Sequence, residues 1–114
     1  MECFGYINTA YYIEHFEEVV LLMKQLSCSC IFYDDRDDVG HLKWKSFVGK
    51  LNDNDTAVLM SFDNAFCTFN DLIFFLKLCS SKNIRIISLC DSLDTSDELF
   101  PKGSTKNMLN AIAN

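Results

Sequence analysis

Residues 3–7 of the chain, Cys-Phe-Gly-Tyr-Ile, form a short and continuously apolar run. An amphipathic segment follows at residues 11–26, with apolar side chains at steps of three and four, and a second apolar run, Cys-Ile-Phe-Tyr, occupies residues 30–33. Short apolar runs are typical of buried strands, and the three-and-four spacing is typical of a helix. The beginning of the chain therefore predicts a strand, a helix and a second strand in succession.

The same alternation continues through the middle of the chain. Periodic apolar spacing predicts helices at residues 42–51 and 68–83, and continuous apolar runs predict strands at residues 56–62 and 84–89. Strands that are apolar along their whole length are typical of parallel sheets covered on both faces. The sequence thus predicts an α/β fold with three layers, in which a four- to five-stranded, mostly parallel sheet carries helices on both faces.

The last part of the chain is more polar. Residues 91–103 contain the only proline, Pro101, and are expected to form a loop. A last helix is expected to begin near Ser104, and its pattern runs to Asn114 without a capping residue, which suits a truncated helix and a naturally short one equally well. Residues 1–114 are predicted to form one domain.

Composition and charge exclude several classes of protein. Of the 114 residues 49% are hydrophobic, which excludes disorder over most of the chain. No apolar run reaches the roughly 18 residues of a membrane-spanning helix, and the first residues lack the basic start of a signal peptide, so a cytoplasmic protein without a membrane partner is expected. DNA binding depends on Lys and Arg at phosphates, and a net charge of −6 predicts that this chain binds DNA poorly by itself.

The six cysteines are expected to be reduced and structural. Cys3, Cys30 and Cys90 fall in apolar, strand-like runs, and Cys79 falls on the apolar face of a predicted helix. Cys28 forms a C-x-C pair with Cys30, but no histidine or second cysteine pair stands at the spacing of a zinc site. Buried free cysteine behaves as a small hydrophobic residue, and no metal or other cofactor is expected.

Three segments, taken in order, resemble a known family. Residues 4–10 are Phe-Gly-Tyr-Ile-Asn-Thr-Ala, residues 62–68 are Phe-Asp-Asn-Ala-Phe-Cys-Thr, and residues 84–89 are followed by Asp-Thr-Ser at 94–96. The N-terminal catalytic domain of the serine recombinases, the resolvase/invertase family, has Phe-Gly-Tyr-Ala-Arg-Val-Ser, Leu-Asp-Arg-Leu-Gly-Arg-Ser and Ser-Leu followed by Asp-Thr-Ser at the corresponding places. The resemblance extends over nearly the whole chain and implies a resolvase-like fold.

The residues that match these motifs are mostly those of the scaffold, whereas the departures fall on catalytic positions. Ala10 stands where the family has the serine that attacks the DNA phosphate, and alanine offers no nucleophile. The family's arginines, which neutralise the phosphate, are replaced by Asn8, Asn64 and Cys67, and one further arginine aligns near Lys43. The resemblance therefore implies a degenerate site without catalytic residues, made up of Tyr6, Asn8, Ala10, Lys43, Asp63, Asn64 and Cys67. The matching scaffold residues are Gly5, Tyr6, Asp34, Asp55, Asp63, Asp94 and Thr95.

A domain of this kind is expected to act through other proteins. Family domains dimerise mainly through the long last helix, whose beginning corresponds to residues 106–114. Met108, Leu109 and Ile112 give this segment an apolar stripe and are the predicted interface. The resemblance implies a homodimer, or a heterodimer with a recombinase, in a site-specific recombination or mobile-element system, with DNA bound weakly or through a segment beyond this sequence.

Other interpretations remain open. One is an active recombinase with a rearranged site, or a phosphoryl-transfer enzyme that depends on the acidic residues at 34–38, although these are expected to form a solvated loop. Another is an unrelated, flavodoxin-like binding domain. Phe74 and Phe75 are adjacent, about 100° apart on a helix, so at least one of them is expected at the surface, where exposed aromatic side chains mark contact sites.

Overall fold

The expected alternation of strands and helices is present in the computed structural model, which describes residues 1–9, 15–35, 42–66 and 68–96. The strands are β1 (Cys3–Asn8), β2 (Cys30–Asp34), β3 (Thr56–Leu59), β4 (Arg85–Ser88) and β5 (Leu93–Asp94). The helices are α1 (Phe16–Gln25), α2 (Leu42–Lys50), α3 (Phe62–Ala65) and α4 (Phe69–Ser81). None of these described helices has both the length and the hydrophobicity that crossing a bilayer requires.

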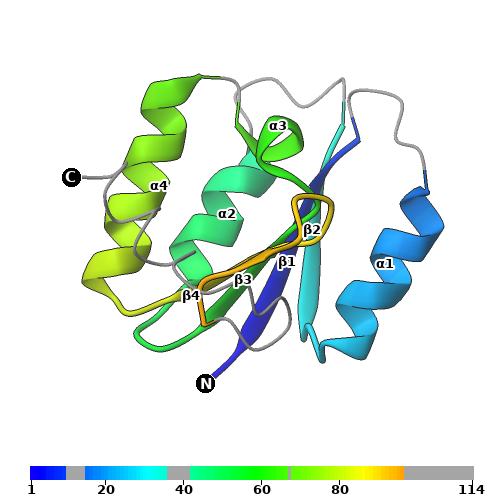
Figure 1. The fold of residues 1–114 in the computed structure, drawn as a ribbon, viewed down its shortest axis with the longest axis horizontal. Helices are drawn as coiled ribbons and strands as arrows, with labels where there is room; N and C mark the ends of the chain where they lie inside the picture. The colour runs from blue at the N-terminus through cyan, green and yellow to red at the C-terminus, as the bar shows by residue number, and fades with distance from the viewer. Residues whose placement is uncertain (10–14, 36–41, 67, 97–114) are drawn as a thin grey trace.

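The strands form one mixed sheet in the order β2-β1-β3-β4-β5 (Figure 1). The first four strands are parallel, with Gly5 opposite Ile31 on one side and opposite Val58 on the other. β5 is antiparallel to β4 and is short. The predicted α/β class with a mostly parallel sheet is confirmed.

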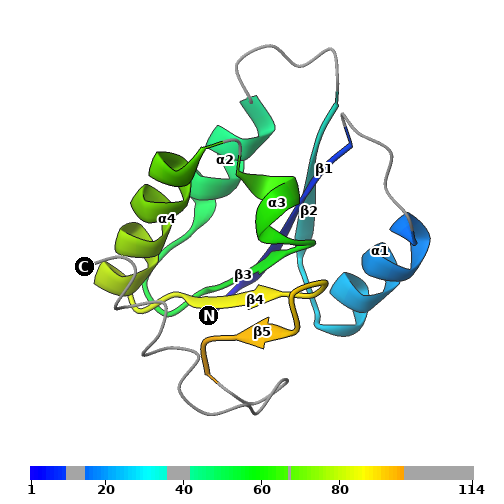
Figure 2. The same ribbon diagram turned by 45° about the horizontal axis from the view of Figure 1, so that its top comes forward.

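Helices cover both faces of the sheet (Figures 1 and 2). Adjacent residues of a strand point to opposite faces. Ile7 accordingly packs into a core with Val19 and Met23 of α1, whereas Tyr6 packs into a second core with Phe47 of α2 and Phe75 of α4. Successive residues of a strand therefore pack alternately against the two helix layers. Because both sets are buried, the strands are apolar along their length.

The core beneath α2 and α4 is aromatic. The ring of Trp44 lies 4.9 Å from that of Tyr6 and 5.3 Å from the rings of Phe66 and Phe75, measured between centroids. Such tilted and edge-on contacts add to the stabilisation from burial alone. Phe75 is fully buried here, while its neighbour Phe74 is 66% exposed, which confirms that one of the pair reaches the surface.

Two elements were not expected from the sequence. The strand predicted at residues 56–62 ends at Leu59, because the Ser61 hydroxyl accepts a 3.0 Å hydrogen bond from the N–H of Asn64 and starts the short helix α3. Residues 93–94, expected in a loop, form β5, because contacts with β4 outside the local sequence hold them there. Both differences lie beside the ends of strands, where one or two hydrogen bonds decide the conformation.

The beginning of α1 also differs from the prediction. His15 has a left-handed backbone conformation, with φ of 61°, and it precedes the first helical residue, Phe16. A left-handed residue cannot belong to a right-handed helix, so α1 begins after His15. The helix expected from Ser104, and the predicted interface at Met108, Leu109 and Ile112, lie outside the described residues.

Two predicted cysteine environments are wrong. Cys79 lies on the buried face of α4 as expected, but Cys30 and Cys90 are exposed. Cys30 begins β2, which is an edge strand with one neighbour only, and Cys90 lies in the turn after β4. An apolar run identifies a strand, but it does not say whether that strand lies at the edge of the sheet.

Candidate functional site

The carboxyl ends of the parallel strands meet at one edge of the sheet. In a doubly wound sheet of order 2-1-3-4-5, the crevice for a ligand lies where the order reverses, between the ends of β1 and β3. β1 ends at Asn8, and β3 is followed by Ser61 and α3. This crevice is the place where the sequence located the degenerate site.

Asn8 and Asn64, which are 56 residues apart in the sequence, are brought together at this edge of the sheet. Oδ1 of Asn64 accepts a 2.8 Å hydrogen bond from the N–H of Asn8, and Nδ2 of Asn64 donates a 2.8 Å hydrogen bond to the C=O of the same residue. The side-chain amide of Asn64 thus satisfies both backbone groups at the end of β1, as a neighbouring strand would. The side chain of Asn64 therefore caps the end of β1.

The residue that positions Asn64 was missed from the sequence. The hydroxyl of Ser61 caps α3 and so fixes the turn that directs Asn64 towards β1. A serine three residues before the N–H that it accepts from is a recognisable capping pattern. The apolar run at residues 56–62 predicts a strand through Ser61, and this hides the capping pattern.

Asp34 is buried, contrary to the expectation of a solvated acidic loop. Its carboxylate is 1% exposed, and Oδ2 accepts a 2.5 Å hydrogen bond from the hydroxyl of Tyr6. Oδ1 and Oδ2 also accept hydrogen bonds of 3.0 and 3.1 Å from the N–H groups of Lys43 and Trp44. A carboxylate is favourable at the first turn of a helix, so Asp34 anchors the beginning of α2 to the sheet.

These contacts give two of the predicted site residues, Tyr6 and Lys43, a structural explanation. Tyr6 is held by Asp34, and Lys43 reaches the same carboxylate with its backbone N–H while its side chain is exposed. Thr9, just after β1, donates from Oγ1 to the C=O of Asp34 at 2.7 Å and extends the pairing of β1 with β2. Ala10 and Cys67 lie outside the described residues.

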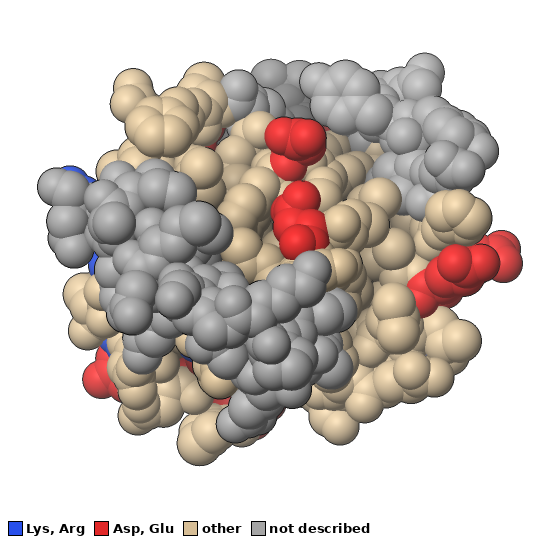
Figure 3. Space-filling model, viewed as in Figure 1, with Lys and Arg blue, Asp and Glu red and all other residues tan. Residues whose placement is uncertain are grey.

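The outer part of this edge is acidic. Asp63 is exposed in the first turn of α3, and Oδ2 of Asp91 accepts hydrogen bonds from the N–H of Phe62 and from the hydroxyl of Ser88, at 2.9 and 2.5 Å. Figure 3 shows acidic side chains near the middle of this face, at and below the position of α3, whereas Lys and Arg side chains lie towards its left margin. Ser88 was also missed from the sequence, because its partner lies in the turn after its own strand.

The thiol beside this edge is a poor nucleophile. Partial burial raises the pKa of Cys90, and the carboxylate of the adjacent Asp91 raises it further. Only the thiolate form of cysteine reacts readily. Among the described residues, no group of three or more His, Cys, Asp or Glu side chains is arranged to hold a metal ion.

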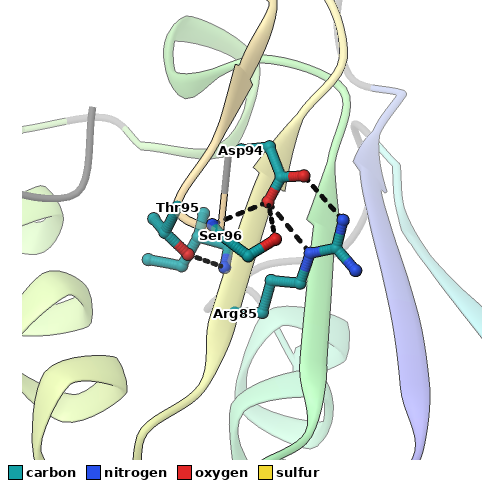
Figure 4. Close-up of polar contacts among 5 residues, drawn as sticks. Arg85, Asp94, Thr95 and Ser96 are labelled. Carbon is teal, nitrogen blue, oxygen red and sulfur yellow. Dashed lines mark hydrogen bonds and ion pairs between the residues drawn. The ribbon is translucent and has the colours of Figure 1, made fainter. Parts of the chain in front are cut away.

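The Asp-Thr-Ser segment that contributes to the resemblance runs along β4 towards its start, with Asp94 opposite Ile87 (Figure 4). Nε and Nη2 of Arg85 donate to Oδ1 and Oδ2 of Asp94 at 2.9 and 2.6 Å, a bidentate ion pair with the carboxylate fully buried. Ser96 donates to Oδ1 of Asp94 from its N–H and its hydroxyl, both at 2.9 Å, and Thr95 accepts from the N–H of Ile86. This segment therefore holds β5 against β4.

The sequence matches no protein-family model, and it has no match among the curated proteins. The chemistry open to this edge of the sheet therefore follows from the groups that lie there. In its described part, they are the amide of Asn64, which is engaged with the backbone, the carboxylates of Asp63 and Asp91, a weakly acidic thiol, and one exposed cation, Lys43. This set can form hydrogen bonds with a partner, and it is poorly suited to an anionic substrate, because exposed carboxylates repel it.

Proposed function

We propose that the chain is a catalytically inactive domain of the serine-recombinase type, which acts by binding other proteins. Its partner is a second copy of the chain or an active recombinase, and its setting is a site-specific recombination system of a mobile element. The order and spacing of the motifs at residues 4–10, 62–68 and 94–96 support this proposal. The α/β fold is compatible with it.

The contact between Asn64 and the backbone of Asn8 carries the inactive part of the proposal. The resemblance aligns both residues with arginines that would face a phosphate. The amide of Asn64 is instead engaged twice by β1, at 2.8 Å in each case. Removing a single donor of this kind from an active site costs roughly 100- to 1000-fold in rate. With Ala10 at the position of the nucleophile, phosphoryl transfer would lack its attacking group as well.

The charge of the same edge supports this conclusion. Asp63 and Asp91 lie beside the Asn8–Asn64 contact, on α3 and after β4. Arg85 lies at the start of β4, away from this edge, and is engaged with Asp94. An approaching DNA phosphate would meet negative charge here, which opposes binding.

Exposed apolar side chains support a role in protein contact. Phe69 and Phe74 on α4 are each 66% exposed, and Leu21 and Leu22 on α1 are 56% and 44% exposed. Large apolar groups at a surface are commonly contact sites. α1 and α4 lie on opposite faces of the sheet, so these residues offer a protein partner apolar contacts on both sides of the domain.

The cytoplasm is the proposed compartment. The five cysteines in the described part of the chain are free thiols, namely Cys3, Cys28, Cys30, Cys79 and Cys90. Thiols remain reduced in that compartment, whereas secreted domains of this size commonly carry disulfides.

Incubation with supercoiled plasmid DNA tests the absence of catalysis. The protein is expected to produce neither nicked plasmid nor a covalent protein–DNA adduct, with or without Mg²⁺, because the phosphoseryl link has no serine to form on at residue 10. An adduct would overturn the proposal. Nicking without an adduct, lost in Asp37→Asn or Asp38→Asn, would indicate the phosphoryl-transfer enzyme that depends on the acidic residues at 34–38 instead.

Light scattering over about 1 to 100 μM protein tests self-association. We expect a dimer that dissociates more readily in Leu109→Glu and Ile112→Glu, because a charge in an apolar interface is poorly solvated. Asn110→Glu adds the same charge to the same segment outside the apolar stripe, and it should leave the dimer intact. A strict monomer over the whole range would contradict the homodimer and leave an active recombinase as the partner to test.

A further inference from the structure

Cys3 and Cys28 lie side by side on the face of the sheet that α1 covers. Cys3 is the first residue of β1, and Cys28 lies in the turn between α1 and β2, 25 residues further along the chain. Their Sγ atoms are 3.1 Å apart. Both side chains are half-buried and pack against the core formed with α1, so small reagents in solvent can reach them.

The backbone holds the two cysteines in this arrangement. The N–H of Ser29 donates a 2.8 Å hydrogen bond to the C=O of Cys3, and the N–H of Cys28 donates a 3.1 Å hydrogen bond to the C=O of Met23. Gly5 leaves room beside them for the side chain of Met23, because a Cβ at this position would lie 2.8 Å from Sδ of Met23, whereas Sγ of Cys28 would be at an ordinary contact distance of 3.6 Å. A disulfide bond is about 2.05 Å long, so the sulfur atoms need to approach by only about 1 Å.

The two thiols differ in acidity, and the difference follows from their contact. The hydrogen bond between the two thiols lowers the pKa of Cys3, against a smaller opposing effect of burial and with help from the guanidinium of Arg85. The same hydrogen bond and burial raise the pKa of Cys28. Cys3 is therefore the thiol that attacks first, since reactivity belongs to the thiolate.

We propose that Cys3 and Cys28 form a reversible dithiol–disulfide site that is oxidised by exchange with a small disulfide such as oxidised glutathione. The thiolate of Cys3 attacks one sulfur of the small disulfide, and the first glutathione thiolate leaves. Sγ of Cys28 loses its proton and then attacks Sγ of Cys3, which expels the second glutathione thiolate. Two protein thiols are oxidised and one glutathione disulfide is reduced to two thiols, which take up the two protons.

The bond would join the start of β1 to the turn before β2 and so enclose α1 in a covalent loop. A link of this kind restricts the unfolded chain, so oxidation should raise the midpoint of thermal unfolding by about 5 °C or more. The site thus connects the thiol–disulfide balance of the surroundings to the stability of the layer that α1 forms. This inference is independent of the proposed role in recombination.

Oxidation of the purified, reduced full chain in a glutathione buffer tests the proposal. The expected product has lost two hydrogen atoms in intact mass, and peptide mapping places its disulfide between Cys3 and Cys28. Reduction with dithiothreitol should restore the original mass and the original unfolding midpoint. A disulfide between other cysteines, or none under conditions that oxidise a small dithiol peptide, would overturn the proposal.

Single variants distinguish the thiol that attacks glutathione disulfide, Cys3, from the thiol that resolves the mixed disulfide, Cys28. Cys28→Ser should accumulate a stable mixed disulfide between Cys3 and glutathione, because the thiol that resolves it is absent. Cys3→Ser should react with glutathione more slowly at Cys28 than Cys28→Ser does at Cys3, because burial still raises the pKa of Cys28 when the contact with Cys3 is gone. Cys30→Ser, a matched change at an exposed position two residues away, should oxidise like the unmodified chain. Equal behaviour of Cys28→Ser and Cys30→Ser, with both folded by circular dichroism, would contradict the assignment.

Discussion

The hydroxyl of Tyr6 donates a 2.5 Å hydrogen bond to Oδ2 of Asp34, and both side chains are almost completely buried. Because Asp34 also accepts hydrogen bonds from the N–H groups of Lys43 and Trp44, this single carboxylate joins β1, β2 and the beginning of α2. One side chain thus fixes the end of β2 to the start of α2.

Tyr6→Phe should lower the free energy of unfolding by about 1.5–3 kcal/mol, because it removes a hydrogen bond to a buried charged group. Urea unfolding measures the change. Tyr33→Phe makes the same chemical change at an exposed position of β2 and should stay within about 0.5 kcal/mol of the unmodified chain. Equal effects of the two variants would show that the contact with Asp34 contributes nothing.

Asn64→Ala should cost about 1–3 kcal/mol of stability, because it leaves the N–H and C=O of Asn8 without this partner. Hydrogen exchange offers a more local measurement, in which the amide of Asn8 should exchange faster while the amides of α1 are unchanged. Asn70→Ala, in the exposed first turn of α4, is the matched control. Unchanged exchange at Asn8 would contradict the role of Asn64 in capping the end of β1.

Arg85→Met should destabilise the domain by about 3 kcal/mol, because the carboxylate of Asp94 is fully buried and would lose its bidentate partner. Lys77→Met, on the exposed surface of α4, removes the same charge and should have little effect. In a double-mutant cycle, Asp94→Asn should cost much less in the Arg85→Met background than in the unmodified chain. Additive costs would show that the two side chains are not coupled.

Two glycines should respond to alanine in opposite directions. A Cβ on Gly5 would lie 2.8 Å from Sδ of Met23, so Gly5→Ala must displace that side chain and should destabilise the domain by about 1–3 kcal/mol. Gly49 lies in α2 with open space around its Cβ position, so Gly49→Ala should stabilise by up to about 1 kcal/mol. Thermal unfolding of both variants checks the sign, and a gain for Gly5→Ala would contradict the close packing.

The thiol of Cys79 should make stability fall at alkaline pH. Burial raises the pKa of Cys79 from 9.0 to about 12, with a smaller opposing effect of Lys82. The unfolded chain therefore loses this proton at lower pH than the folded chain, so the free energy of unfolding declines as the pH rises above about 9.

Between about pH 8 and pH 10, the decline from this one group amounts to about 1.4 kcal/mol. Cys79→Ala should show a decline smaller by that amount, whatever its stability at neutral pH, and Ser80→Ala should keep the decline of the unmodified chain. Chemical unfolding at a series of pH values measures it. Parallel curves for Cys79→Ala and the unmodified chain would rule out the effect.

Most elements of the fold could be predicted from local pattern. The apolar run at residues 3–7 and the periodic segment at 68–83 correspond to β1 and α4, because each buries one continuous surface that shows in the spacing of its residues. α3 and β5 could not be predicted in this way. They are four and two residues long, and each depends on a partner elsewhere, Ser61 at the start of α3 and Arg85 across from β5.

The candidate site was predicted in part. The sequence selected Asn8 and Asn64 as separate departures from a motif, and the structure shows that they contact each other. The sequence assigned Asp34 to a solvated loop, but it is buried under α2. Residue type alone could not distinguish these cases, since a carboxylate is tolerated in the interior only where several donors converge on it.

By itself, the sequence determined the class of the fold and the positions of its main strands and helices, because the period of apolar residues records which surface each segment buries. It also determined that residue 10 carries no nucleophile. Only the tertiary structure decided which polar side chains meet. The closure of the β1 end by Asn64 and the pairing of Cys3 with Cys28 join residues far apart in the chain, and such contacts depend on how the strands are ordered in the sheet.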